Sequence, residues 1–267
     1  MKVRSFASGS SGNALLVESG GIRLLVDAGL PPALLFRRLR DAGLQRGSLS
    51  AILLTHEHID HAQGAAVLAQ EWQVPIISAP ETLRKVLPTP EEGGSRWAEP
   101  LEVGKSLRVG TLEVTSFPVS HDAIAPCGYM IHSGAWRICV AVDTGDVPGA
   151  MLEMLRAAHL LVVEANHDRE RLLNGPYPWH LKQRILSPTG HLSNEQTIRA
   201  LEAIVDNTPR WVWLAHLSKT NNTPDLARRQ IIERLTRSGA NFIQADILPP
   251  GAGPVWDSTS LWADAAR

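Results

Sequence analysis

The chain has 267 residues, a formal net charge of −1 and a hydrophobic content of 44%. A chain of this size and composition can bury a large core, and a near-neutral total excludes a globally basic nucleic-acid-binding surface while leaving room for a local basic groove. No apolar run approaches the roughly 18 residues of a membrane-spanning helix, and the N-terminus lacks the apolar core of a signal peptide. We therefore expect a cytoplasmic protein with no membrane partner, in which Cys127 and Cys139 are buried free thiols.

Short apolar runs separated by glycine and serine turns predict strands in the first part of the chain. These runs are residues 3–7, 14–18, 22–26 and 51–54. Pro31 and Pro32 open a predicted helix that extends through Leu39 and that Gly43 ends. A second helix is expected over residues 60–70, and a short strand over residues 75–78.

The second half of the chain returns to a strand pattern after an irregular stretch. Residues 88–100, rich in Pro, Gly and Glu, are predicted to form an exposed loop or insertion. Strands are expected at 107–109, 111–117, 128–132 and 137–142, and helices and strands then alternate to about residue 244, including 160–163, 194–205 and 211–214. This order favours two packed sheets with helices outside, in a single domain over residues 1–267 whose tail from about residue 249 is loosely attached.

The densest group of metal-ligand side chains is the run His56-Glu57-His58-Ile59-Asp60-His61, directly after a buried strand. At a strand end, residues i and i+2 lie on one side, so His56 and His58 can reach the same ion. Asp60 and His61 would project toward a neighbouring point from the first turn of the following helix. Such a run can serve two metals, which lie roughly 3.5–4 Å apart in dinuclear hydrolases. Imidazole and carboxylate ligands suit zinc, manganese or iron, and the lack of cysteine ligands argues against a closed structural zinc site.

Three more ligand-type residues, His121, Asp143 and His216, each follow an apolar strand. Strand ends of this kind converge on one edge of a fold, so the three side chains can join the histidine run. Together they complete two sets of ligands: His56, His58 and His121 for one ion, Asp60, His61 and His216 for the other, with Asp143 between them.

The motif His-x-His-x-Asp-His, followed in order by an isolated His, an Asp and a His, resembles the metallo-β-lactamase superfamily over about residues 1–245. The resemblance implies an αββα sandwich of two mixed β-sheets flanked by helices, with a dinuclear site at one edge. It also implies that Asp27, in the run LLVDAG, orients the ligand loops without binding metal.

Further motifs resemble the YycJ family, also called WalJ or VicX. They are ASGSSGN at 7–13, EANHD at 164–168, YPWHLKQRI at 177–185, GHLSN at 190–194 and HLSKTNN at 216–222. That family is associated with DNA exonuclease activity, so the resemblance implies a nucleic-acid substrate, DNA more than RNA.

Phosphodiester cleavage benefits from an acid that protonates the leaving oxygen, and His191 is the candidate for this role. It lies just before a helix N-terminus at Ser193 or Asn194, and Glu164 is the candidate carboxylate that orients its ring. Ser10 and Asn13 in a glycine-rich turn, with Lys182 and Lys219, are weaker candidates for contacts to substrate phosphates. A tight structural turn and solvated surface charge are the competing explanations of these four residues.

The predicted function is a metal-dependent phosphodiester hydrolase, and specifically a DNA exonuclease. Two divalent ions per chain, Zn or Mn with Fe as an option, would activate the attacking water, with Asp60, Glu164 and His191 as catalytic residues. A small-molecule or RNA phosphodiesterase is the alternative, and a thioester or lactam hydrolase would leave the Glu164 and His191 pair without a purpose. The intact ligand set argues against a non-catalytic accessory protein, and the oligomeric state is left open.

Overall fold

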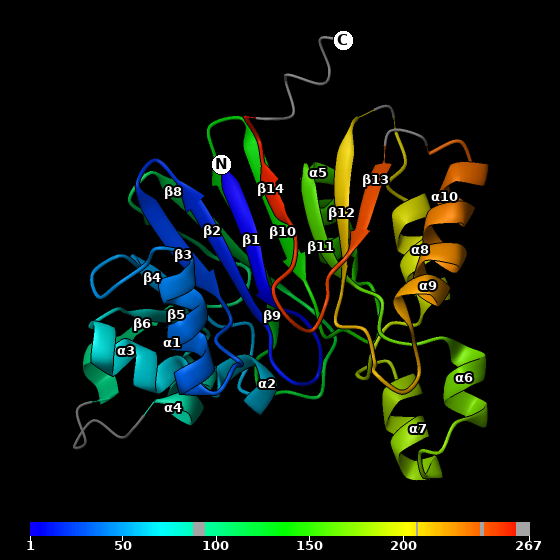
Figure 1. Cartoon of the computed structure of the whole chain (residues 1–267), viewed down its shortest axis with the longest axis horizontal. Helices are drawn as coiled ribbons and strands as arrows, with labels where there is room; N and C mark the ends of the chain where they lie inside the picture. The colour runs from blue at the N-terminus through cyan, green and yellow to red at the C-terminus, as the bar shows by residue number, and fades with distance from the viewer. Residues whose placement is uncertain (88–93, 207, 241–242, 260–267) are drawn as a thin grey trace.

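A computed structural model describes residues 1–87, 94–206, 208–240 and 243–259. Two seven-stranded β-sheets lie face to face, and helices cover their outer surfaces (Figure 1). Each sheet contains both parallel and antiparallel pairs. The predicted αββα sandwich of two mixed sheets is therefore confirmed.

The first sheet has the strand order β14-β1-β2-β3-β4-β5-β6. Its antiparallel part is β14 (Val255–Asp257), β1 (Lys2–Ala7), β2 (Ala14–Ser19) and β3 (Ile22–Val26). Its parallel part adds β4 (Ala51–Leu53), β5 (Ile76–Ser78) and β6 (Ala98–Pro100) to β3.

The second sheet has the strand order β13-β12-β11-β10-β9-β8-β7. Its antiparallel strands are β7 (Ser106–Val109), β8 (Leu112–Pro118), β9 (Cys127–Ser133) and β10 (Trp136–Ala141). The parallel strands β11 (Leu160–Glu164), β12 (Arg210–Ala215) and β13 (Ile243–Ile247) follow β10. Because β8 runs in the same direction as β10, the strands β8, β10, β11 and β12 all end at the same edge of this sheet.

The central strands β10 and β11 are apolar on both faces because each face is covered. On β10, Ile138 and Val140 belong to the core between the sheets, whereas Cys139 and Ala141 pack under the helices of the second sheet. Alternate residues of a strand point to opposite faces, so a strand buried on both sides needs a continuous apolar run. This explains why the sequence shows unbroken runs such as 138–142 where a half-exposed strand would alternate.

Within the described residues, the first half of the chain contributes the α-helices α1 (Pro32–Asp41), α2 (Ile59–Ala62), α3 (Ala65–Trp72) and α4 (Pro80–Val86). The second half contributes α5 (Gly149–Ala157), α8 (Asn194–Glu202), α9 (Pro224–Ala227), the π-helical turn η3 (Arg228–Ile232) and α10 (Glu233–Arg237). Helices α6 (Arg169–Asn174) and α7 (Trp179–Leu186) project together beyond the lower edge of the second sheet (Figure 1). In the part of the chain that the structure describes, no helix is long and apolar enough to cross a bilayer.

The helix predicted over residues 60–70 is two helices, α2 and α3, separated at Gln63 and Gly64. A Cβ atom at Gly64 would lie 2.8 Å from the Leu30 carbonyl oxygen, so the loop after β3 packs directly on this backbone. The Gly64 N–H donates to the Ala28 carbonyl at 2.7 Å. The contact fixes the ligand-bearing helix α2 against the loop that carries Asp27.

Two segments predicted to be irregular pair with the first sheet. Of the predicted loop at 88–100, residues 88–93 lie outside the described residues, residues Gly94–Trp97 form the 3₁₀ helix η2, and β6 pairs with β5. Pro100 is tolerated there because β6 is an edge strand.

The prediction of a loosely attached tail from about residue 249 is also wrong for residues 255–257. They form β14 on the edge of β1, and Trp256 is buried against Trp136 and Trp211. A three-residue strand is too short for alternation to reveal it. Residues 260–267 lie outside the described residues.

Candidate metal centre

The predicted ligands come from four loops that meet at one edge of the sandwich. His56 and His58 follow β4, His121 follows β8, Asp143 follows β10, and His216 directly follows β12. Asp60 and His61 lie in the first turn of α2. The loops converge because β8, β10 and β12 end at the same edge and the first sheet packs across them.

The structure brings these seven side chains into two overlapping groups. His56, His58, His121 and Asp143 each offer a ligand atom within 4.8 Å of one another, and so do Asp60, His61, Asp143 and His216. Asp143 belongs to both groups, which is the arrangement of a carboxylate shared by two ions. The structure thus brings the seven predicted side chains together, and their assignment as ligands of two ions stays a prediction.

The chemistry of these side chains fits bound cations. His56 is 1% exposed, and its Nε2 atom has no hydrogen-bond partner among the described residues. The rings of His56 and His61 lie 4.2 Å apart, and His58 Nδ1 is 3.2 Å from His121 Nε2. Burial, followed by the neighbouring His61, holds the pKa of His56 well below its usual value, so His56 is a neutral imidazole, the form that binds metal. A cation beside His56 Nε2 would give this buried atom the partner that it lacks among the described residues.

Backbone strain is concentrated at this centre. Asp27, Asp143 and His216 have φ angles of 57°, 54° and 56°, in the left-handed region that non-glycine residues rarely adopt. Each of these residues directly follows an apolar strand, or lies one residue after it. The strained conformation turns the chain sharply, so that a side chain at the strand end points into the site.

Asp27 holds His61 and the start of the histidine run. Its Oδ2 atom is 2.8 Å from His61 Nδ1, and its Oδ1 atom accepts the backbone N–H of Thr55 at 2.9 Å. With Nδ1 bonded in this way, His61 directs Nε2 toward Asp143 Oδ2 at 3.0 Å. Burial opposes the charged ring, but Asp143 and Asp27 together raise the pKa of His61 to about 10. The geometry is that of a carboxylate that orients a metal-binding histidine.

The glycine-rich turn near the N-terminus supports the ligand loop from the other side. Asn13 is buried, its backbone N–H donates to the Asp60 carbonyl at 2.8 Å, and its Nδ2 atom is 2.9 Å from His61 Nε2. A Cβ atom at Gly29 would lie 1.7 Å from the Asp60 carbonyl oxygen, so only glycine permits this contact. Asn13 thus contacts the ligand residues, whereas Ser10 in the same turn is exposed.

His191 and Glu164 form a close pair beside the metal ligands. His191 Nδ1 is 2.7 Å from Glu164 Oε1, and the His191 ring stacks on that of His216 at 5.4 Å. Glu164 is fully buried and also accepts the backbone N–H of Thr144 at 2.9 Å. The His191 side chain remains 20% exposed. The pair therefore has one buried, fixed partner and one partner open to a substrate.

The charges of this pair stabilise each other. Burial disfavours the Glu164 carboxylate, but His191 and the hydrogen bonds to His191 and His216 lower the pKa of Glu164 to about 2. Burial also disfavours the His191 imidazolium, but Glu164 and then Asp143 raise the pKa of His191. A positioned, protonated imidazole next to a hydrolytic metal centre can act as a general acid.

The two lysines predicted to contact phosphate lie in different surroundings. Lys182 is 9% exposed, and its ammonium donates to the carbonyls of Leu173 and Gly175 at the end of α6. Two of the three N–H groups of this ammonium are therefore used within the protein, which argues against the predicted contact of Lys182 with substrate phosphate. Lys219 is exposed and lines a hollow of about 740 Å³. Ser8 and Leu217, which neighbour His216, also line this hollow.

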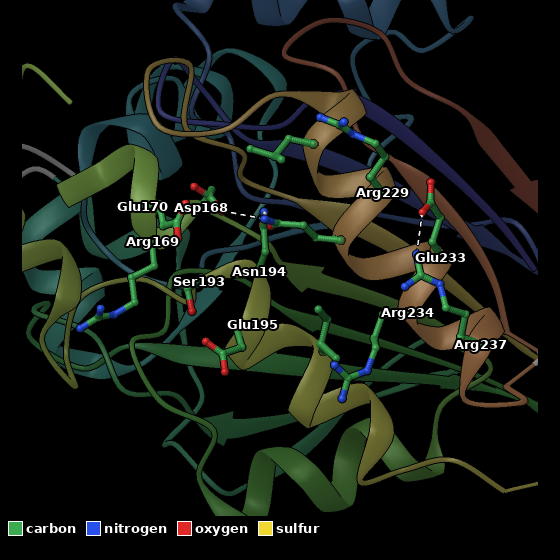
Figure 2. A pocket seen from close by; sticks show the side chains of 13 residues that line it. Asp168, Arg169, Glu170, Ser193, Asn194, Glu195, Arg229, Glu233, Arg234 and Arg237 are labelled. Atoms are coloured by element: carbon green, nitrogen blue, oxygen red, sulfur yellow. Dashed lines mark hydrogen bonds and ion pairs between the residues drawn. The ribbon is translucent and has the colours of Figure 1, made fainter. Parts of the chain in front are cut away.

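A second hollow, of about 780 Å³, lies away from the predicted metal ligands, between α6, α8, η3 and α10. Figure 2 shows arginine and acidic side chains on its walls. They are Arg169, Arg229, Arg234 and Arg237 with Asp168, Glu170, Glu195 and Glu233. The opposite charges balance, and Gln230 links Asp168 to Asn194 across the hollow. None of the metal-ligand residues lines this hollow, so volume alone does not locate the site.

Several side chains that position the site could not be identified from the sequence. Thr55 donates to Asp27, Asn166 donates to the His216 carbonyl at 3.0 Å, and Asp122 pairs with Arg184. Thr55 and Asp122 directly neighbour predicted ligands, and Asn166 follows Glu164 closely, so proximity in sequence was the available signal. Nothing in the sequence indicated which partner each would bond.

A model of the β-lactamase superfamily domain matches residues 22–217, and the chain belongs to the metallo-β-lactamase superfamily. It is 36% identical over 260 residues to the exodeoxyribonuclease WalJ of Streptococcus pneumoniae serotype 2, strain D39, covering 95% of this chain and 97% of that protein. It is 37% identical over 239 residues to the exodeoxyribonuclease YycJ of Bacillus anthracis, covering 87% and 88% of the two chains.

Among solved structures, the metallo-β-lactamase fold protein YhfI of Bacillus subtilis is similar to this chain with a TM-score of 0.70 and 20% identity. The similarity covers 96% of this chain and 99% of YhfI. The likeness shows the fold, and the closer sequence relatives show the family.

Replacing the carboxylate shared by both ligand groups tests the centre. Chelator-treated protein reloaded with zinc or manganese should hold about two metal equivalents per chain. Asp143→Asn should lower this to about one or less, because both groups lose a ligand. Elemental analysis after gel filtration measures the content, and Asp146→Asn, an exposed carboxylate three residues further on, is the matched control. Unchanged metal content in Asp143→Asn would contradict the shared site.

Proposed function

We propose that this protein is a metal-dependent DNA exonuclease that hydrolyses phosphodiester bonds at strand ends. The observation that carries this proposal is the His191 and Glu164 pair, at 2.7 Å, beside two ligand groups that share Asp143. The identity of 36–37% to exodeoxyribonucleases of two bacteria over most of the chain supports DNA as the substrate.

We propose a dinuclear centre with His56, His58 and His121 on one ion, Asp60, His61 and His216 on the other, and Asp143 between them. Zinc or manganese suits this imidazole and carboxylate set, with iron as an option. When bound, two such ions supply a water of lowered pKa and neutralise charge on the phosphoryl oxygens. Asp27, bonded to His61 Nδ1, keeps the tautomer and direction of that ligand ring.

The proton of the leaving oxygen comes from His191 in this proposal. Glu164 holds His191 Nδ1, so Nε2 is the ring atom left to deliver a proton. The leaving group of a phosphodiester is an alkoxide, which departs far more readily when it is protonated. After the transfer, Glu164 remains bonded to the ring and keeps it in place for reprotonation from solvent, which reaches the partly exposed His191 side chain.

A small-molecule or RNA phosphodiesterase of the same fold would use the same residues. The hollow beside His216, which Lys219 and Arg228 line, is large enough for nucleotides and does not distinguish these substrates. Thioester or lactam hydrolysis is less well supported, because those leaving groups need no dedicated acid and the pair would then be unused. We place the protein in the cytoplasm, since Cys127 and Cys139 are free, buried thiols.

Removing the acid should separate chemistry from metal binding. His191→Ala is expected to lower kcat on end-labelled DNA by about a hundredfold to ten-thousandfold, the usual contribution of a general acid. Its metal content should stay at the wild-type level. His132→Ala, a partly exposed histidine on β9, is the matched control. Full activity in His191→Ala would refute the assignment, and loss of metal would make His191 a ligand.

Glu164→Gln should change the pH dependence of the reaction. Glu164 raises the pKa of His191, so removing the negative charge lowers this pKa, and the imidazole loses its proton at lower pH. The alkaline limb of the kcat profile should therefore move to lower pH. The measurement is kcat against pH for metal-loaded enzyme, with the exposed Glu170→Gln as control. A limb that stays in place, or moves upward, would argue against the pairing.

A further inference from the structure

An ion pair ties helix α7 to the loop that carries a metal ligand. Arg184, in the last turn of α7, donates from Nε to Asp122 Oδ2 at 2.5 Å. Asp122 directly follows His121, and its Oδ1 atom is 3.5 Å from His121 Nε2. Arg184 is therefore anchored beside the metal centre.

The same turn of α7 also positions the proposed acid. The His191 backbone N–H donates to the Ile185 carbonyl at 3.0 Å. A Cβ atom at Gly190 would lie 2.3 Å from the carbonyl oxygens of both Arg184 and Ile185, so the loop closes tightly on the helix end. Arg184 and His191 thus belong to one packed unit, and their separation is fixed by backbone contacts.

The Nη atoms of the Arg184 guanidinium are free to donate hydrogen bonds to a ligand. The Arg184 side chain is 56% exposed, and only Nε has a hydrogen-bond partner among the residues that the structure describes. The carboxylate that Arg184 contacts belongs to Asp122, which directly follows the predicted ligand His121, so the guanidinium lies near the predicted metal ligands. A fixed guanidinium with two free Nη groups is well suited to bind phosphate oxygens. Lys182, two residues earlier, is less suited to this role because two of the three N–H groups of its ammonium are bonded to carbonyls within the protein.

We propose that Arg184 forms a phosphate-binding subsite that holds the terminal phosphate of a DNA strand while the adjacent phosphodiester lies on the metal centre. This rests on the proposed exonuclease function. The metal ligands and His191 are placed around the scissile group, and Arg184 lies at the exposed rim of the same site. Its charge is already partly offset by Asp122, which suits recognition of a nearby phosphate more than stabilisation of charge developing at the metals.

The subsite predicts that a terminal phosphate improves DNA binding through Arg184. Short single strands that end in a 5′-phosphate, a 3′-phosphate or only hydroxyls are titrated against chelator-treated protein, and fluorescence anisotropy reports binding without hydrolysis. Wild-type protein should bind one phosphorylated end more tightly than the hydroxyl ends, by about tenfold to a hundredfold, as expected for charge-assisted hydrogen bonds. Arg184→Ala should remove this preference.

The matched control is Arg199→Ala, which also removes an exposed arginine paired with a carboxylate, but on α8. This variant should keep the preference for the phosphorylated end. A wild-type protein that does not distinguish phosphate from hydroxyl ends would overturn the proposal, and so would an Arg184→Ala protein that still does.

A second measurement separates substrate binding from a structural role of Arg184. Metal-loaded Arg184→Ala should lose a larger factor of kcat/KM on DNA with a phosphorylated end than on bis(4-nitrophenyl) phosphate, which has no terminal phosphate; any loss on this ester measures the positioning effect of the ion pair with Asp122. A matching loss of kcat/KM on this ester would mean that Arg184 only positions the α7 unit, which overturns the subsite. Failure of the exonuclease function would instead appear as absent DNA hydrolysis by wild-type protein, while the anisotropy result stands by itself.

Discussion

The Asp143 carboxylate is the point on which the rest of the site depends. Its Oδ2 atom lies 3.0 Å from His61 Nε2, and its Oδ1 atom lies 2.8 Å from His216 Nδ1. The carboxylate belongs to both ligand groups. Asp143 is buried, and its backbone has a left-handed φ angle, a strained conformation that the surrounding structure must stabilise. Burial alone would favour its neutral form, but His216 and His61 hold its pKa well below the usual value. The cluster is therefore a compact set of mutually dependent charges that bound cations would complete.

The architecture supplies what this cluster needs. Parallel strand ends bring side chains far apart in sequence to one edge, and the tight contact of Gly29 with Asp60 brings the first sheet to the same place. Around the ligands, Asp27 orients His61, and Glu164 orients His191. The unit of α7 and the His191 loop is tied to the His121 loop by Arg184 and Asp122. Binding of metal, delivery of a proton and recognition of substrate are thus carried by connected elements.

Much of this could be predicted because the informative residues are local in sequence. The run from His56 to His61 predicts a metal site by itself. The buried strands can be predicted from their continuous apolar runs. Long-range pairing could not be predicted: Asp122 and Arg184 are 62 positions apart, and nothing in the sequence links the two residues. Lys182 was a reasonable phosphate contact from its motif, but the turn between α6 and α7 directs it to carbonyl groups. The short strands β6 and β14 could not be predicted either, because three residues show no alternation and each strand forms only by pairing with a neighbouring strand, β5 or β1.

The central claim is that the paired ligand groups and His191 together hydrolyse DNA ends. The most direct test is titration of chelator-treated protein with manganese or zinc while release of nucleotides from end-labelled DNA is followed. Activity should rise from none to a plateau at about two metal equivalents per chain, and His61→Ala should not reach it. Hydrolysis that survives chelation, or a fully loaded protein that leaves DNA intact, would contradict the account.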